Sequence, residues 1–189
     1  MGKKVGLTRG AVVTAASELA DQEGLEGVTL AAVAKRLGVR SPSLYAHVDG
    51  LAGLRRSLAL VAAAAMASTL RHAREGRQGA MALRALAHAY RGFVMAHPGW
   101  YAAALQSVPS GRDDELYRAL TEMVIPFVET LGELGVAPGE VIHLTRAIRS
   151  ALHGFVSLER GNGFGMPVDF DRSFDRMVEL VVRGVGGEG

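Results

Sequence analysis

The 189-residue chain contains no cysteine, which excludes disulfide bonds and metal sites built from thiolates. Its longest unbroken apolar run, Leu58 to Ala67, has ten residues and is shorter than the ~20 that a membrane-spanning helix needs. The first ten residues, MGKKVGLTRG, have no apolar signal core. These absences predict a protein of the reducing cytoplasm with neither an export signal nor a membrane anchor.

The sequence also has few features of a catalytic site. None of its six histidines pairs with another at the i, i+4 spacing beside an acid that a helical zinc site uses. No glycine-rich phosphate loop follows a strand, and no segment has a convincing strand pattern. We therefore expect no enzyme, no metal and no cofactor. A Ser/His/acid triad can be dispersed along a chain, so catalysis stays the main rival class.

Charge is unevenly distributed along the chain. Residues 1–60 contain eight lysines and arginines against five acids, a net charge of +3, while the remainder has thirteen bases and fourteen acids, a net charge of −1. A basic N-terminal part is what phosphate binding requires, although this asymmetry alone is a weak signal. Hydrophobic residues make up 49% of the chain, which indicates a globular protein.

The segment 28–48, VTLAAVAKRLGVRSPSLYAHV, predicts two short helices joined by a tight turn. Thr29 is a suitable N-cap, and Gly38 stands where a left-handed C-cap requires glycine. Ser41 is expected to cap the second helix, with Pro42 in its first turn. The first helix has one apolar face with helical spacing, formed by Leu30, Val33, Ala34 and Leu37. This pattern predicts a helix-turn-helix.

The second helix divides into an anchoring side and an outer side at about 100° per residue. Leu44 and Val48 point towards the body of the domain. The outer side carries small residues, with a polar ring on each flank: Pro42, Ser43 and Ala46, flanked by Tyr45 and His47. Such a face suits the major groove of DNA. The alternative is an ordinary small helix packed on a core.

The segment from Leu7 to Val48 resembles the DNA-binding domain of the tetracycline-repressor (TetR) family of transcriptional regulators. The resemblance implies an all-α homodimer with a three-helix DNA-binding head and a larger helical domain for dimerisation and ligand binding. Thr29 resembles the phosphate contact of the family, and further residues match positions that touch DNA in its members: Arg40, Ser41, Pro42, Ser43, Tyr45 and His47. Leu51 replaces a common family lysine, and whether Arg55 or Arg56 substitutes for it stays open.

We expect about nine helices, with a head over residues 1–50 and a second domain over 51–189. The expected helices are Arg9–Glu23 capped by Thr8, Leu30–Leu37, Pro42–Val48, a linking helix Gly50–Arg74, Ala80–Ala96, a short helix around Trp100, a helix to Leu134 interrupted at Pro126, Gly139–Arg160 and Phe170–Arg183. We expect residues 1–6 to form a loose arm whose Lys3 and Lys4 can lie along DNA; the alternative, more common for terminal lysines, is that both are simply solvated.

The second domain is expected to dimerise through its last two helices. Ala147, Ala151 and Gly154 place small residues along one side of the penultimate helix; a wholly intramolecular core is the alternative. Candidate ligand-pocket residues are mostly aromatic: Tyr90, Phe93, Met95, Trp100, Tyr101, Met123, Phe127, His143, Arg146 and His153. We expect a repressor of a palindromic operator released by a small apolar or aromatic ligand. The rival is a DNA-binding protein of the same fold with no small-molecule effector.

Overall fold

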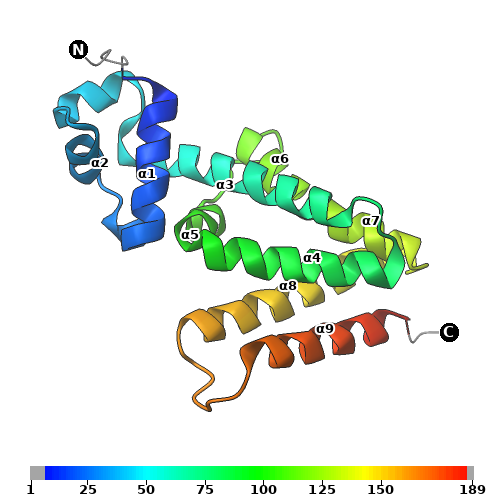
Figure 1. Cartoon of the computed structure of the whole chain (residues 1–189). Helices are drawn as coiled ribbons and strands as arrows, with labels where there is room; N and C mark the ends of the chain where they lie inside the picture. Colours follow the sequence, from blue (N-terminus) through cyan, green and yellow to red (C-terminus); the bar gives the residue numbers. More distant parts are fainter. Residues whose placement is uncertain (1–6, 187–189) are drawn as a thin grey trace. The chain divides into compact units, whose positions relative to one another are not determined.

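A computed structural model describes residues 7–186 of the chain, and within this range all of its regular secondary structure is helical (Figure 1). The elements are α1 (Arg9–Glu23), η1 (Leu25–Gly27), α2 (Leu30–Leu37), η2 (Ser41–Ala46), α3 (Gly50–Arg74), α4 (Gly79–Ala96), α5 (Pro98–Gln106), α6 (Glu115–Glu122), α7 (Ile125–Glu133), α8 (Pro138–Arg160) and α9 (Phe170–Gly186). The expected all-α fold is confirmed. The predicted Lys3 and Lys4 arm lies outside the described residues.

The helix starts and stops that the sequence predicts are formed by local chemistry. The Thr8 hydroxyl accepts a hydrogen bond from the backbone N–H of Ala11 at 3.1 Å, and the Thr29 hydroxyl accepts one from Ala32 at 3.1 Å. Each bond satisfies a donor that a helix N-terminus leaves without a partner. Gly38 ends α2 with φ 66° and ψ 29°, the left-handed conformation predicted for it.

The prediction for the second helix of the motif needs correction. Ser41 does not cap the second helix of the motif: η2 begins at Ser41 itself, Arg40 occupies the cap position and no side chain bonds the first turn. The segment is also a 3₁₀ helix, a form that short uncapped segments adopt readily. The interruption predicted at Pro126 is confirmed: α6 ends at Glu122, and α7 begins at Ile125 with Pro126 in its first turn.

Contacts between Cα atoms divide the chain into two compact units. The first contains the residues up to 64 together with 96–120, and the second contains 65–95 together with the residues from 121 onward. The long helix α3 contributes its first half to one unit and its second half to the other. The units do not coincide with the expected domains 1–50 and 51–189, which stay a prediction based on the helix-turn-helix motif.

Helix α5 is fastened to α1 inside the first unit. A Cβ atom on Gly99 would lie 2.1 Å from the backbone of Ala20, so only glycine permits this approach. Asp21 caps α5 from α1, because its Oδ1 accepts the backbone N–H of Gly99 at 2.9 Å. His97 Nδ1 lies 3.1 Å from Oδ2 of the same carboxylate. The turn before α5 is therefore held on the helix that supports the helix-turn-helix.

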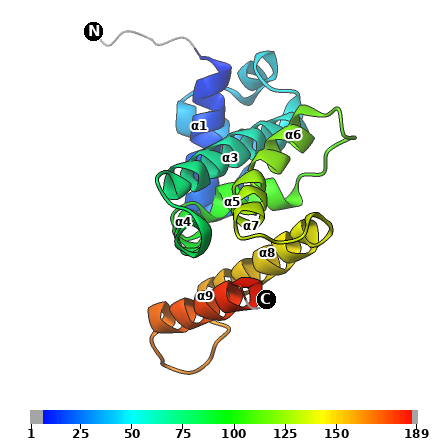
Figure 2. The ribbon, with the colours of Figure 1, turned by 90° about the vertical axis from the view of Figure 1, so that its right-hand side faces the viewer.

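In the second unit, α4 buries the face predicted for it, formed by Leu83, Leu86, Tyr90, Phe93 and Val94. Helices α8 and α9 lie side by side and are joined by residues 161–169 (Figures 1 and 2). Phe155 of α8 and Phe174 of α9 meet edge to face, with ring centroids 5.1 Å apart. Aromatic pairs prefer this geometry, and it helps to hold the two helices together.

Helix α3 is long and apolar enough to cross a membrane if length and composition alone are considered. Four of its large apolar side chains, however, are fully buried in the fold, namely Leu54, Leu58, Met66 and Leu70. Burial inside the protein therefore accounts for part of the apolar composition of this helix.

Candidate nucleic-acid interface

The segment η2 is anchored by two side chains and held by short-range backbone bonds. The N–H of Ser43 donates to the carbonyl of Arg40 at 2.9 Å, and the N–H of His47 donates to that of Leu44 at 2.9 Å. The N–H of Val48 also reaches the carbonyl of Leu44, at 3.0 Å. This last bond has α-helical spacing, so Leu44 and Val48 share one face. Both are buried, with exposed fractions of 0% and 7%.

The opposite side of η2 faces away from the core of its own unit. Pro42, Ser43, Tyr45 and Ala46 are exposed, and the Tyr45 side chain is 63% accessible. Ser41 and His47 are half-buried on the flanks. The division into an anchoring side and an outer side is therefore the one that the sequence predicts.

Basic residues close to this face differ in how they are paired. Arg36 is held by α1, because its Nη2 lies 2.6 Å from Glu18 Oε2 and its Nη1 donates to Gln22 at 2.9 Å. Lys35 and Arg40 are exposed and make no ion pair with any residue that the structure describes. Their charges are therefore available to an external anion such as a phosphate.

Comparison with known proteins places this geometry in a family. Residues 12–50 match the family described as bacterial regulatory proteins, tetR family, and residues 83–181 match the tetracyclin repressor-like C-terminal domain. The chain belongs to the TetR family. Members of this family are DNA-binding transcriptional regulators with a helix-turn-helix, and they are not enzymes.

Relatives of this TetR-family chain match it over nearly its whole length. An uncharacterized HTH-type transcriptional regulator of Bacillus subtilis, YobS, is 36% identical over 98% of this chain and 96% of its own. A Rhodococcus protein of unknown function shares the fold, with a TM-score of 0.81, 20% identity and 96% of each chain covered. ActR, a TetR-family protein of Streptomyces coelicolor solved in complex with (S)-DNPA, has a TM-score of 0.70 at 18% identity, covering 97% of this chain and 98% of its own.

The question raised by Leu51 is whether a nearby arginine replaces the lysine common in the TetR family. Arg56 is bound to the carboxylate of Asp114 in a two-pronged ion pair. Arg55 donates to the carbonyl of Leu25 at 3.4 Å and lies 3.6 Å from a Glu26 oxygen. Both guanidinium groups thus make contacts within the first unit, and whether either takes the place of that lysine on DNA stays open.

The ion pair of Arg56 shows what the sequence alone does not reveal. The Arg56 guanidinium holds the pKa of Asp114 well below its usual range, helped by the backbone N–H groups of Ser110 and Leu116. In return, Asp114 raises the pKa of Arg56. Asp114 is 58 positions away in sequence, and no local pattern connects the two residues. Only the folded chain shows that this arginine is already used.

The predicted ligand-pocket residues fall into two groups in the structure. Several are buried in helix packing: Tyr90, Phe93, Tyr101, Met123 and Phe127. Trp100 is half-buried, whereas Met95, His143, Arg146 and His153 are exposed. His143 and Arg146 lie on the side of α8 opposite its buried residues. The structure therefore does not bring the whole predicted set into one cavity, and their contact with a ligand stays a prediction.

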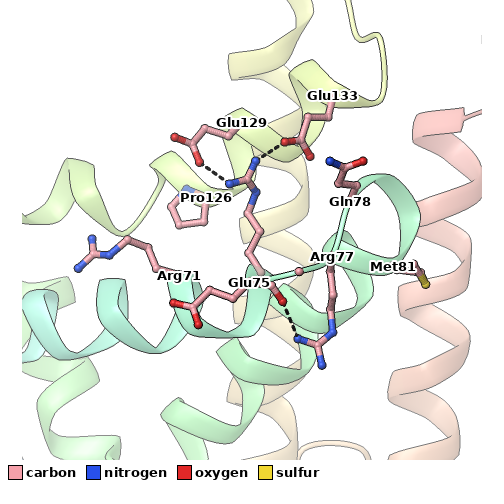
Figure 3. A pocket seen from close by; sticks show the side chains of 10 residues that line it. Arg71, Glu75, Arg77, Gln78, Met81, Pro126, Glu129 and Glu133 are labelled. Atoms are coloured by element: carbon pink, nitrogen blue, oxygen red, sulfur yellow. Dashed lines mark hydrogen bonds and ion pairs between the residues drawn. The ribbon is translucent and has the colours of Figure 1, made fainter.

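A pocket of about 600 Å³ in the second unit lies where the turn between α3 and α4 meets α7 (Figure 3). Sequence analysis missed it, because its walls are mostly charged rather than aromatic: Arg71, Arg74, Glu75, Arg77, Gln78, Met81, Pro126, Glu129 and Glu133. Arg74 stands between Glu129, 2.9 Å away, and Glu133, to which it is also bonded. The charges of this pocket are thus largely neutralised by one another.

Proposed function

We propose that this TetR-family regulator is a homodimeric repressor that reads a palindromic operator with η2 of each protomer and leaves it on binding a small molecule. The observation that carries the proposal is the orientation of η2: Leu44 and Val48 anchor it from behind, while Ser43 and Tyr45 are exposed in front. A short helical segment of this kind can enter the major groove with its small residues against base edges.

The proposed DNA contacts divide by chemistry into base reading and phosphate binding. The Ser43 hydroxyl can donate to or accept from a base edge, and the apolar surfaces of Pro42 and Ala46 suit thymine methyl groups. Tyr45 and His47 would lie at the height of the phosphates. The remaining phosphate contacts would come from Thr29, Arg40 and Ser41, at the N-terminus of α2 and in the turn before η2.

The proposed dimer forms through α8 and α9. Their outer side combines small residues with exposed apolar ones: Leu158 is 46% and Leu180 is 73% accessible. Space beside Gly154 is open, because nothing lies within 4 Å of a Cβ built there. Two such surfaces related by a two-fold axis would form a four-helix contact. The two η2 segments would then read half-sites about 34–36 Å apart, or a multiple of that distance.

The ligand response is proposed from the family fold and from ActR, whose structure contains a bound small molecule. The ligand here would be apolar or aromatic and would contact the buried aromatic residues, of which Tyr90, Phe93 and Phe127 are examples. Such coupling is typically worth ~1–3 kcal/mol, which is a 5- to 150-fold change in operator affinity. A DNA-binding regulator of this kind would act in the cytoplasm.

The test is operator binding by fluorescence anisotropy, with a DNA site selected from a random library on the purified protein. The double variant Tyr45→Ala/His47→Ala should weaken binding to all duplexes, by about tenfold or more, because it removes phosphate contacts. Ser43→Ala should instead alter the preference at one base pair. The matched control is Met81→Ala/His72→Ala, which removes an exposed apolar side chain and an exposed histidine from the second unit.

Each outcome of this experiment decides between named alternatives. Equal affinity of the Tyr45/His47 variant and the wild-type protein would show that the groove-facing side is misassigned. Operator affinity that no small molecule in a broad screen changes would favour a DNA-binding protein of the same fold without an effector. A monomer at micromolar concentration in sedimentation would remove the dimer from the proposal.

A further inference from the structure

A second pocket, of about 620 Å³, lies within the first unit between α1, α3 and α5. We propose that it binds a small organic anion: a molecule with an apolar body and one carboxylate, sulfonate or similar group. Its volume is in the range of small-molecule sites. The inference does not depend on the proposed repressor function, because it follows from the chemistry of the pocket walls alone.

The walls of the pocket are largely apolar. Val13 of α1, Leu60 and Val61 of α3 and Trp100 of α5 line it. Val61 is 40% accessible although it belongs to a helix whose other large apolar side chains are mostly buried. The Trp100 indole N–H is buried and has no acceptor among the described residues. The Trp100 N–H is thus left without a hydrogen-bond acceptor. The apolar side chains of this wall offer surface to the body of a ligand.

The positive charge at the pocket comes from Arg9. Arg9 is the first residue of α1, and its Nη2 donates to the hydroxyl of Ser57 at 3.1 Å. No carboxylate in the described part of the chain pairs with it, and the first turn of α1 contains no acid. A helix N-terminus carries a partial positive charge, and a guanidinium there adds to it. An anion at this end of the pocket would meet a guanidinium that no described carboxylate pairs with.

Two carboxylates also line the pocket, and one of them is bound by an arginine. Glu18 is bound by Arg36, whose Nε and Nη2 donate to its Oε2 at 2.9 and 2.6 Å. Glu115 is the first residue of α6, a position at which a helix favours a negative charge. Arg9 is the only cation among the described residues that line the pocket, and it is the group that an anion would contact.

The charged pocket of the second unit differs from this pocket in how its arginines are paired (Figure 3). It contains three arginines, but each one already has acceptors. Arg71 lies 3.4 Å from Glu122, Arg74 is held by two glutamates, and Arg77 donates to the carbonyl of Ala73 at 2.9 Å. An anion there would have to displace bonds that the protein already makes. The number of arginines alone does not mark an anion site; an arginine without a carboxylate beside an apolar wall does.

The experiment uses the fact that Trp100 is the only tryptophan of the chain. The probe is 1-anilinonaphthalene-8-sulfonate, an aromatic sulfonate that accepts excitation energy from tryptophan. Its neutral counterpart N-phenyl-1-naphthylamine has the same rings without the charge. The sulfonate should bind the wild-type protein and quench Trp100. Arg9→Gln should weaken its binding by about tenfold or more, as expected for the loss of a charge-assisted contact, with much less effect on the neutral probe.

Two further variants separate the site from general effects. Val61→Glu adds a negative charge to an exposed position of the apolar wall and should also weaken sulfonate binding. Arg77→Gln, in the pocket of the second unit, is the matched control and should leave it unchanged. Circular dichroism melts show whether each variant is folded. Unchanged sulfonate affinity in both Arg9→Gln and Val61→Glu would overturn the site. Equal losses for both probes in Arg9→Gln would overturn the anionic class.

Discussion

The charged residues of the second unit and those beside η2 are used in opposite ways. In the second unit, Arg84 binds Glu179 with Nε 2.5 Å from Oε1, and Arg91 binds Glu159 and Asp171. Beside η2, Lys35 and Arg40 have no acidic partner among the described residues. Charges paired within a chain contribute to its fold, whereas unpaired exposed charges contribute to what it binds. The two groups of basic residues therefore differ in whether a carboxylate lies within ion-pair distance, and not in residue type.

The pair with most effect on the fold should be that of Arg91, which is 15% exposed and faces a Glu159 carboxylate that is 7% exposed. Glu159 and then Asp171 raise the pKa of Arg91 above its usual value. Arg91→Met would leave the buried Glu159 without its partner, and we expect a loss of ~3–5 kcal/mol in the free energy of unfolding, measured with urea. Arg160→Met, at an exposed position of α8, is the control and should cost less than ~0.5 kcal/mol.

A double variant sharpens this result. Arg91→Met/Glu159→Gln removes both charges of the pair, so it should recover a substantial part of the stability lost by Arg91→Met. Double-mutant cycles isolate such a coupling. If the double variant is as unstable as the sum of the two single ones, the interaction is not a coupled pair and the packing of the Arg91 stem is responsible.

The next largest loss of stability is expected for Asp21, whose carboxylate is hydrogen-bonded within the first unit. Its carboxylate accepts the backbone N–H groups of Gly99 at 2.9 Å and Trp100 at 3.4 Å. Asp21→Ala should therefore cost ~1–2 kcal/mol, the usual value for the loss of a helix cap. Glu23→Ala, two residues further along α1 and exposed, is the matched control and should be nearly neutral. Equal losses in both variants would mean that the cap is not the cause.

The ion pair between Asp114 and Arg56 should make the stability of the protein depend on pH. The pKa of Asp114 is lowered in the folded state, chiefly by Arg56, so the native carboxylate stays ionised at pH values where the unfolded chain, with an ordinary pKa of about 3.9, already binds a proton. The stability from this pair is complete above that value and is lost as the pH falls below it. Urea midpoints between pH 6 and pH 2.5 should fall less steeply for Asp114→Asn than for the wild type. Asp113→Asn, at the exposed neighbouring position, should keep the wild-type slope.

Local signals in the sequence predict most of the helices. Thr8 and Thr29 mark helix starts that the structure reproduces, and Gly38 marks the end of α2. These signals work because a cap bond joins residues three positions apart. The 3₁₀ form of η2 was not predicted, since the choice between i−3 and i−4 bonds in a six-residue segment depends on how Leu44 and Val48 are anchored.

The ion-pair partners of the charged residues could not be predicted from the sequence, for a different reason. Arg56 finds Asp114 across 58 positions, and Arg91 finds Glu159 across 68. Nothing in the local sequence distinguishes these arginines from Arg40, whose charge stays exposed. The pocket between α1, α3 and α5 is likewise assembled from distant segments. The outer face of η2 could be predicted from the sequence, because one short helix carries all of its residues.

The smallest effects on stability are expected where the charges face outward. Lys35→Gln and Arg40→Gln should change the free energy of unfolding by less than ~0.5 kcal/mol, because neither side chain has an acidic partner in the described chain. If the charge of each contacts one phosphate, each substitution should reduce the slope of log affinity against log salt by about 1, without changing sequence preference. Arg36→Gln is the matched control on α2: since Arg36 is bound to Glu18, its loss should affect stability more than the salt slope. The opposite pattern, with Arg36 governing the slope and Arg40 the stability, would contradict the division between inward and outward charges.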